Sequence, residues 1–251
     1  MTQSLRPLIG SWIQFAQTAH AEILANAGFD WLCVDLEHSV IGLREAEDLI
    51  RIIETKGVTP LVRVSSNDPV QISRVMDAGA HGIIVPRVDT AKEAQRTVDA
   101  VFYPPKGMRG VGLARAHKYG ELFDEYLEWV SKNGLVIVQI ESSESVKNLS
   151  EILSVEGVGG FMVGPYDLSC SLGVPGKLDD QLVVECLEEI MRVAKKFPQS
   201  KRGVHKVSTD HQPVLDAIEQ GFDFIAYSTD MLFLGEACRQ GMSKILRSLN
   251  R

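Results

Sequence analysis

The sequence predicts a single (β/α)8 barrel, in which eight parallel strands close on themselves inside a ring of helices. Apolar runs of strand length alternate with amphipathic stretches of helix length along the whole chain. A weak internal repeat also places a glycine and a short turn ahead of an apolar run, four times. No low-complexity segment or linker divides the chain, so we expect one domain over residues 1–251.

The apolar runs lack polar alternation, which is typical of parallel strands that are buried on both faces. The repeat glycines suit the left-handed residue that ends a helix before such a strand. The eight expected strands lie at Leu8–Gln14, within 27–35, at Thr59–Val64, within 78–86, at Leu135–Ile140, within 156–164, at Lys201–Val204 and within 220–228.

Amphipathic stretches between these strands predict the helices, and two of them begin at recognisable caps. Asp68 precedes Pro69 at a first helical position, and Asp210 lies ahead of Pro213. The clearest expected helices are Leu43–Thr55, Val70–Asp77, Thr90–Val101, Ser145–Leu153, Gln181–Lys195 and Leu234–Leu249.

Two local features bear on the topology. A doubly wound open sheet would carry a glycine-rich phosphate turn after its first strand, and residues 14–18 contain none. The stretch 87–134 is too long for one helix and a turn. We therefore expect its middle, 103–115, to be a long functional or interface loop.

Composition excludes several classes of protein. Hydrophobic residues make up 45% and charged residues 24%, which is typical of a globular chain. A net charge of −7 argues against a nucleic-acid partner. Four widely spaced cysteines favour reduced thiols, and Met1–Pro7 lacks the apolar core of a signal peptide. The cysteine usage leads us to expect a cytoplasmic protein, and because no apolar run approaches the length of a membrane span, we expect no membrane partner.

Polar and ionisable residues follow five of the expected strands. The active site of a (β/α)8 barrel lies at the carboxyl ends of its strands, so these residues should converge. The five clusters are Asp35-Leu36-Glu37-His38, Arg63, Pro86-Arg87, Gln139-Ile140-Glu141 and Gly164-Pro165-Tyr166-Asp167. A base, cations and carboxylates in one place predict an enzyme.

Individual residues indicate the chemistry. Glu141 and Asp167, from adjacent strands, could bind a hard divalent cation, and Gln139 strengthens that interpretation. The same two carboxylates could serve a glycosidase as acid and base, but aromatic residues for sugar stacking make up only 7%. Arg63 ends an apolar strand and needs a carboxylate from the protein or a ligand. His38 lies beside two acids that could set its basicity.

Five segments together resemble the HpcH/HpaI family of class II, metal-dependent pyruvate aldolases, which includes 4-hydroxy-2-oxoheptanedioate aldolase. The resemblance runs from about Gly10 to the last helix, in the same order and at similar spacing. The segments are Asp35-Leu36-Glu37-His38, Asn67-Asp68-Pro69, Tyr103-Pro104-Pro105-x-Gly107-x-Arg109-Gly110-Val111-Gly112, Gln139-Ile140-Glu141 and Gly164-Pro165-x-Asp167-Leu168-Ser169.

The resemblance implies reversible aldol cleavage of a 4-hydroxy-2-oxo acid to pyruvate and an aldehyde through a metal-stabilised pyruvate enolate. Glu141 and Asp167 would then hold Mg²⁺ or Mn²⁺, with Co²⁺ also compatible. Arg63 matches the arginine that supports the enolate charge, and His38 matches the general base. The residues expected to bind substrate are Trp12, Gln139, Gly164, Pro165, Arg115 and Arg87.

The resemblance also pairs the histidine with an aspartate that matches Asp77. This residue ends a helix that runs back towards the bottom of the barrel, so a neighbouring subunit would have to supply it. Members of the family form hexamers in which the last helix is exchanged between neighbours, and the amphipathic segment Leu234–Leu249 is compatible with that exchange. We therefore expect a homo-oligomer, either a trimer or a hexamer.

Three alternatives remain open. The first is a related lyase that acts on a malyl- or citramalyl-type thioester with the same enolate chemistry; the missing nucleotide motif disfavours it. The second is a Schiff-base aldolase that uses Lys206, at the end of the seventh strand. The third is a catalytically silent barrel with a binding role, which the presence of His38, Arg63 and the two carboxylates disfavours.

Overall fold

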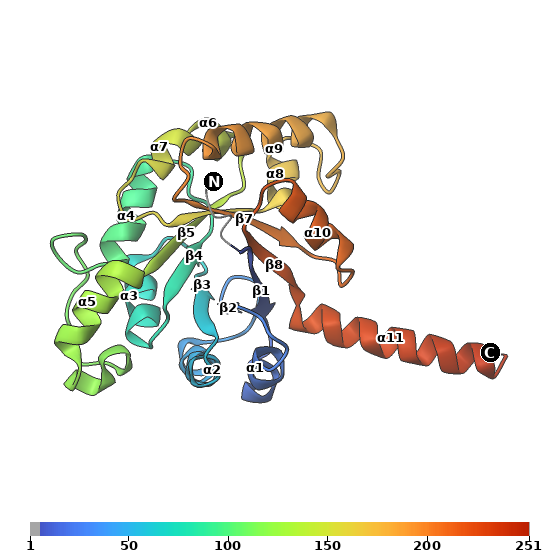
Figure 1. Ribbon diagram of the computed structural model, residues 1–251, viewed down its shortest axis with the longest axis horizontal. Helices are drawn as coiled ribbons and strands as arrows, with labels where there is room; N and C mark the ends of the chain where they lie inside the picture. Colours follow the sequence, from blue (N-terminus) through green and yellow to red (C-terminus); the bar gives the residue numbers. More distant parts are fainter. Residues whose placement is uncertain (1–5, 251) are drawn as a thin grey trace.

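The computed structural model describes residues 6–250 and contains a closed barrel of eight parallel strands in sequence order (Figure 1). The (β/α)8 prediction is therefore confirmed. Residues 1–5 and 251, which the single-domain expectation included, lie outside the described residues. The strands are β1 Leu8–Ile13, β2 Trp31–Asp35, β3 Thr59–Arg63, β4 Gly82–Val85, β5 Leu135–Ile140, β6 Gly160–Val163, β7 Lys201–Lys206 and β8 Phe224–Thr229.

Helices follow the strands and form the outer layer of the barrel (Figure 1). The expected helix over Ser145–Leu153 is wrong in detail, because Asn148 leaves helical geometry and divides it in two. The helices are α1 Thr18–Ala25, α2 Leu43–Thr55, α3 Pro69–Asp77, α4 Ala91–Val101, α5 Phe123–Asn133, α6 Ser143–Lys147, α7 Leu149–Leu153, α8 Pro165–Ser171, α9 Gln181–Ala194, α10 Gln212–Glu219 and α11 Asp230–Ser248, with a 3-10 segment η1 at Arg115–Gly120.

Local sequence signals set the ends of these elements. The Asp68 carboxylate accepts a hydrogen bond of 3.0 Å from the Val70 amide, with Pro69 in the first turn of α3. The repeat glycines have left-handed backbones, with φ of 96° at Gly28 and 94° at Gly221, as the repeat predicted.

The interior of the barrel is filled by large side chains from alternate strand positions. Trp31 stacks on Phe224 with ring centroids 4.5 Å apart, and both are buried. Because strand residues alternate between faces, the positions two residues further along each strand also point inward, closer to the carboxyl-terminal mouth. The interior layer consists of Trp12, Trp31, Cys33, Leu61, Ile84, Ile137, Met162, Phe224 and Ala226.

The long segment between α4 and β5 lies at the amino-terminal side of the barrel. Helix α4 returns the chain to that side and β5 starts from it, so residues 102–122, η1 and α5 stay there. Arg115 confirms this placement, because it bonds the Ala78 carbonyl at the end of α3. The long loop predicted from sequence is present, on the side opposite the mouth.

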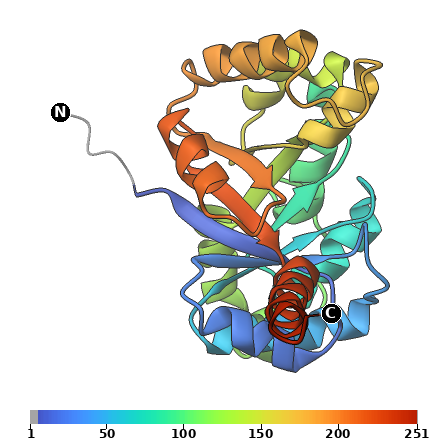
Figure 2. The same cartoon turned by 90° about the vertical axis from the view of Figure 1, so that its right-hand side faces the viewer.

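The last helix, α11, projects away from the barrel instead of covering it (Figures 1 and 2). A cavity of about 410 Å³ lies beside its first turn, between α1, β1 and β8, where the eighth helix of a closed barrel would pack. An apolar stripe on α11 is exposed: Met231, Leu234, Met242 and Ile245, continued by Leu249 directly after the helix. Across residues 6–250, every helix is too short or too polar to cross a membrane.

The close approach of β1 to Trp31 gives a stability prediction. A Cβ atom at Gly10 would lie 2.0 Å from the Trp31 ring, so Gly10→Ala should lower the free energy of unfolding by about 2–3 kcal/mol through overpacking. Gly110→Ala, where a Cβ would meet nothing within 4 Å, serves as the control. Urea unfolding followed by tryptophan fluorescence measures both; equal midpoints for the two variants would contradict the prediction.

Candidate active site

The inward positions at the mouth of the barrel carry polar side chains in place of the apolar interior. Asp35, Arg63 and Gln139 each follow an interior residue by two positions on β2, β3 and β5, and His205 follows the buried Gly203 on β7. They lie just above Trp12, whose ring is 4.3 Å from the Arg63 guanidinium carbon and 5.6 Å from the His205 ring centroid. Along each strand the inward-pointing side chains therefore change from apolar to polar within one layer. We call the polar layer at the mouth, together with the Trp12 ring below it, the floor of the site.

Asp35 and Arg63 form a buried ion pair across neighbouring strands. Register places the two residues side by side, and Asp35 receives bonds of 2.8 Å from Arg63 Nε and 2.6 Å from Nη2. Asp35 is fully buried, which alone would raise its pKa, but the Arg63 bonds and charge lower that pKa below its usual value. The carboxylate partner that the sequence required for Arg63 is therefore found within the protein.

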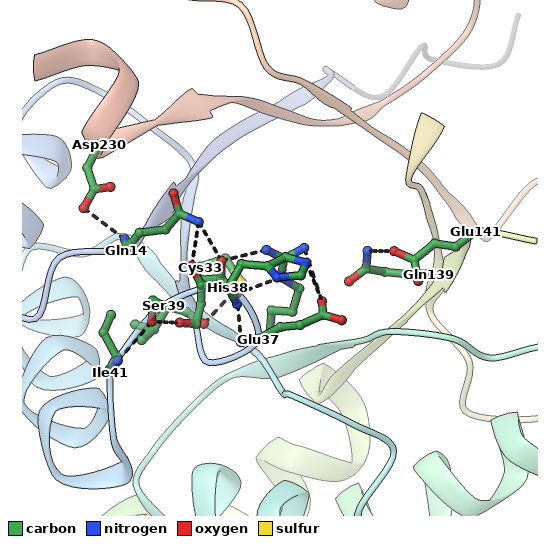
Figure 3. Close-up of polar contacts among 12 residues, drawn as sticks. Gln14, Cys33, Glu37, His38, Ser39, Ile41, Gln139, Glu141 and Asp230 are labelled. Carbon is green, nitrogen blue, oxygen red and sulfur yellow. Dashed lines mark hydrogen bonds and ion pairs between the residues drawn. The ribbon is translucent and has the colours of Figure 1, made fainter. Parts of the chain in front are cut away.

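The same aspartate fixes the turn that carries His38. Its Oδ1 accepts backbone N–H bonds of 3.0 Å from Glu37 and 3.3 Å from His38, and Gln14 bonds both Oδ2 and the His38 carbonyl (Figure 3). The His38 ring remains exposed, with Nε2 3.8 Å from Glu37 Oε2. Burial raises the pKa of Glu37, against the opposing charges of Arg63 and His38.

The carboxylate pair lies on the opposite side of the mouth. Glu141 accepts a 3.1 Å bond from the Arg87 amide, and Gln139 donates its side-chain N–H to the same carboxylate (Figure 3). Asp167 is exposed in the first turn of α8. Burial raises the pKa of Glu141 to about 7, and the charges of Asp167 and Glu37 add to that rise.

These groups surround one cavity of about 260 Å³ at the mouth. Its lining is Glu37, His38, Arg87, Asp89, Glu141, Ser142 and Asp167. The sequence had selected His38, Arg87, Glu141 and Asp167, and the structure brings all four together. It had not selected Asp89, which accepts a hydrogen bond from the Ser142 hydroxyl. The only sequence signal for Asp89 is its place two residues after Arg87 in a strand-to-helix turn.

The donor set fits a divalent cation that keeps open positions. Glu141 and Asp167 provide carboxylate oxygens, and the buried Gln139 Oε1 lacks a hydrogen-bond partner in the described part of the chain. No group of three or more His, Cys, Asp or Glu side chains within residues 6–250 has the geometry of a complete metal site. A cation held here would therefore need water or substrate oxygens as further ligands, as magnesium sites commonly have.

The two basic residues at the end of β7 face opposite ways. His205 points into the barrel, where its charged neighbours are Arg63 and Asp35. The charged neighbour of Lys206 is Asp216 of α10, outside the barrel, whose charge acts on the pKa of Lys206. Lys206 therefore lies on the far side of the strand from the carboxylates. This geometry disfavours the Schiff-base alternative.

Two predicted site residues are not at the mouth of their own barrel. Asp77 pairs with the buried guanidinium of Arg109, and Arg115 pairs with Glu54 and bonds the Ala78 carbonyl. Both lie at the amino-terminal side. His117, another residue of the long loop, is buried there and accepts the Ala114 N–H. Within one chain these residues are remote from His38.

The mouth of this (β/α)8 barrel carries a buried arginine, a histidine and two carboxylates. Such a set of groups is typical of an enzyme with an acidic active site that can bind a cation. The family model described as HpcH/HpaI aldolase/citrate lyase matches residues 8–236. The chain belongs to that family.

Individual relatives agree with this assignment. The chain is 38% identical over 234 residues to a 4-hydroxy-2-oxo-heptane-1,7-dioate aldolase of Escherichia coli, covering 92% of this chain and 88% of the relative. It is 36% identical over 229 residues to a hydroxypyruvate/pyruvate aldolase of Roseobacter denitrificans, covering 90% and 88%. An HpcH/HpaI aldolase/citrate lyase family structure from Burkholderia cenocepacia superimposes with a TM-score of 0.90, at 32% identity and 96% and 95% coverage.

His205 gives a prediction about acid stability. Burial and the Arg63 charge lower its pKa to about 4, so the folded protein keeps this ring neutral while the unfolded chain protonates it near 6.5. Stability should therefore fall as the pH drops from about 6.5 to 4, with roughly 3 kcal/mol of that loss due to His205.

Urea unfolding of the wild type and of His205→Gln across this range measures the effect. The variant should lose less stability on acidification than the wild type. His211→Gln, at an exposed position ahead of α10, should behave as the wild type does. Parallel pH profiles for the wild type and His205→Gln would contradict the assignment.

Proposed function

We propose that this protein is a divalent-metal-dependent aldolase that reversibly cleaves a 4-hydroxy-2-oxo acid to pyruvate and an aldehyde. The observation that carries the proposal is one cavity lined by Glu141, Asp167 and His38, beside an Arg63 that Asp35 holds and that lies 3.4 Å from the Glu37 carboxylate. The aldolase names of the relatives at 38% and 36% identity support it.

Glu141 and Asp167 are proposed to hold the cation, which we expect to be Mg²⁺ or Mn²⁺ and which Co²⁺ could replace. When bound, such an ion supplies Lewis-acid polarisation of the 2-oxo group. Gln139 keeps Glu141 oriented through its amide N–H, and the Arg87 amide holds the second carboxylate oxygen. Because both contacts already orient the Glu141 carboxylate, it needs to move less when the cation binds.

His38 is proposed as the general base for cleavage. Its exposed ring can accept the proton of the C4 hydroxyl, directly or through water, at Nε2. The C3–C4 bond then breaks, C4 becomes the aldehyde, and the bonding electron pair passes into the enolate of pyruvate. Transfer of the proton from His38 to C3, directly or through water, completes the reaction and returns His38 to its basic form. Arg63, held in place by Asp35, would stabilise the enolate charge without moving.

The remaining mouth residues are proposed to bind substrate. Trp12 forms part of the floor, and Gly164 approaches Glu141 so closely that a Cβ there would lie 2.9 Å from Oε1. Pro165 begins α8 beside it, and the Arg87 side chain lines the cavity. An aldehyde that carries a carboxylate or several hydroxyls would suit this arginine.

We also propose that the working form is a homo-oligomer, a trimer or hexamer, in which neighbours exchange α11. The exposed apolar stripe of α11 and the cavity beside β1 and β8 support this exchange. A neighbouring chain would bring its Asp77 to His38 and its Arg115 to the aldehyde. The described cysteines form no disulfide, which supports the cytoplasmic location that we propose.

Hydrogen–deuterium exchange at the methyl group of pyruvate tests the enolate chemistry without knowledge of the aldehyde. NMR in D₂O should show exchange with Mg²⁺ or Mn²⁺ and none with EDTA. Glu141→Ala should abolish it, whereas Glu144→Ala, at an exposed position in α6, should leave it unchanged. Exchange that survives EDTA, or an absence of exchange under every condition, would refute the proposed function.

The exchange of α11 makes a separate prediction. Combined Met242→Glu and Ile245→Glu substitutions place charges on the exposed apolar stripe and should shift the mass, measured by light scattering, towards that of one chain. Lys244→Glu and Gln240→Glu change the polar positions beside the stripe and should leave the assembly intact. An unchanged mass for the stripe variant would exclude α11 as the oligomer contact.

A further inference from the structure

A second cavity, of about 670 Å³, lies outside the barrel, behind β7 and between α9 and α10. It falls within the size range of small-molecule sites. Its walls are largely apolar, formed by Leu178, Val184, Leu187, Met191, Val204 and Phe222. The cavity opens to the surface beside the exposed side chains of Tyr166 and Val184, so a ligand can reach its apolar wall from solvent.

One cation is directed into this apolar space. Lys206 and Val204 are on the outward face of β7, and the Lys206 side chain lines the cavity. Burial lowers the pKa of Lys206, and the described residues give its ammonium group neither an ion pair nor a hydrogen bond. Asp216 acts on Lys206 only through its charge and is bonded to Gln212, while Glu188 lines the cavity without pairing with the lysine.

The geometry argues against the apolar α11 of a second copy as the occupant of the cavity behind β7. The vacant position for an eighth helix is the other cavity, between α1, β1 and β8. The cavity behind β7 lies on the opposite side of α10 and ends under Pro165 and Tyr166 at the start of α8. An apolar helix would also leave the Lys206 ammonium group unpaired, which is costly away from water.

We propose that the cavity behind β7 is a binding site for a small amphiphile with one anionic head group, such as a medium-chain carboxylate. The head group pairs with Lys206, and the hydrocarbon chain lies along Leu187, Met191 and Phe222. Apolar burial supplies the affinity and the single charge supplies the orientation. The cavity borders the mouth at Pro165 and His205 but shares no lining residue with the cavity that holds Glu141 and Asp167, so its ligand is distinct from the substrate of the proposed reaction.

Calorimetric titration of the full chain with decanoate, below its aggregation concentration, tests this site without any turnover. We expect saturable binding, at least about ten-fold tighter than that of decanamide or decyltrimethylammonium, which lack the negative charge. Lys206→Met keeps the apolar stem, and decanoate should then bind no better than decanamide. Leu187→Trp fills the cavity and should abolish binding, whereas Lys196→Met, at an exposed position, should change nothing.

Several results would overturn the proposal. One is the absence of saturable decanoate binding to the wild type; another is binding that both Lys206→Met and Leu187→Trp leave intact, which would place the amphiphile elsewhere, for example on α11. Equal affinity for the cationic probe would remove the role of Lys206. A changed oligomeric mass for Leu187→Trp, without decanoate binding to the wild type, would assign the cavity to a second copy. Thermal melting monitors folding of each variant.

Discussion

The buried pair between Asp35 and Arg63 is the interaction on which the rest of the candidate site depends. Asp35 has no exposure to water, and removing one member of such a pair costs about 3–5 kcal/mol because the other charge is left unpaired. The same carboxylate accepts the backbone N–H groups of Glu37 and His38, so the histidine turn and the arginine share one anchor. Arg63 in turn covers the Trp12 ring. A rigid, charged floor is what electrostatic stabilisation of a developing anion requires, because its groups need not reorganise.

The topology of the barrel separates the residues of the proposed site into two sets. Strand ends place His38, Arg63, Glu141 and Asp167 at the mouth, whereas every residue between α4 and β5 stays at the other side. The Asp77–Arg109 contact belongs to that second set. A loop confined to the amino-terminal side can act at a mouth only when another barrel presents it. The projecting α11 offers a physical means of holding two barrels together, so oligomerisation and the completion of the site are parts of the same proposal.

Much of this arrangement could be predicted from sequence because it depends on local rules. The repeats of glycine, turn and strand predicted the barrel, and the Asp68-Pro69 cap predicted where α3 begins. Arg63 at the end of an apolar strand implied a carboxylate, but its identity as Asp35 depends on the register of β2 and β3, which spacing alone does not reveal. The direction of α11 was equally hidden, since one amphipathic pattern suits a helix on its own barrel or on a neighbour's. Alternation along β7, by contrast, separates His205 from Lys206 once the strand is located.

The charge of the mouth explains why the proposed reaction needs a cation. Four carboxyl groups, Glu37, Asp89, Glu141 and Asp167, line one small cavity, and Arg63 is already paired with Asp35. His38 and Arg87 line the same cavity, but the charges of Asp167 and Glu37 still add to the rise that burial causes in the pKa of Glu141, so a further negative charge beside these carboxylates would be disfavoured. A divalent cation between Glu141 and Asp167 would neutralise that pair and reverse the local field. Binding of the cation and binding of an anionic substrate should therefore reinforce each other, because each relieves the repulsion that opposes the other.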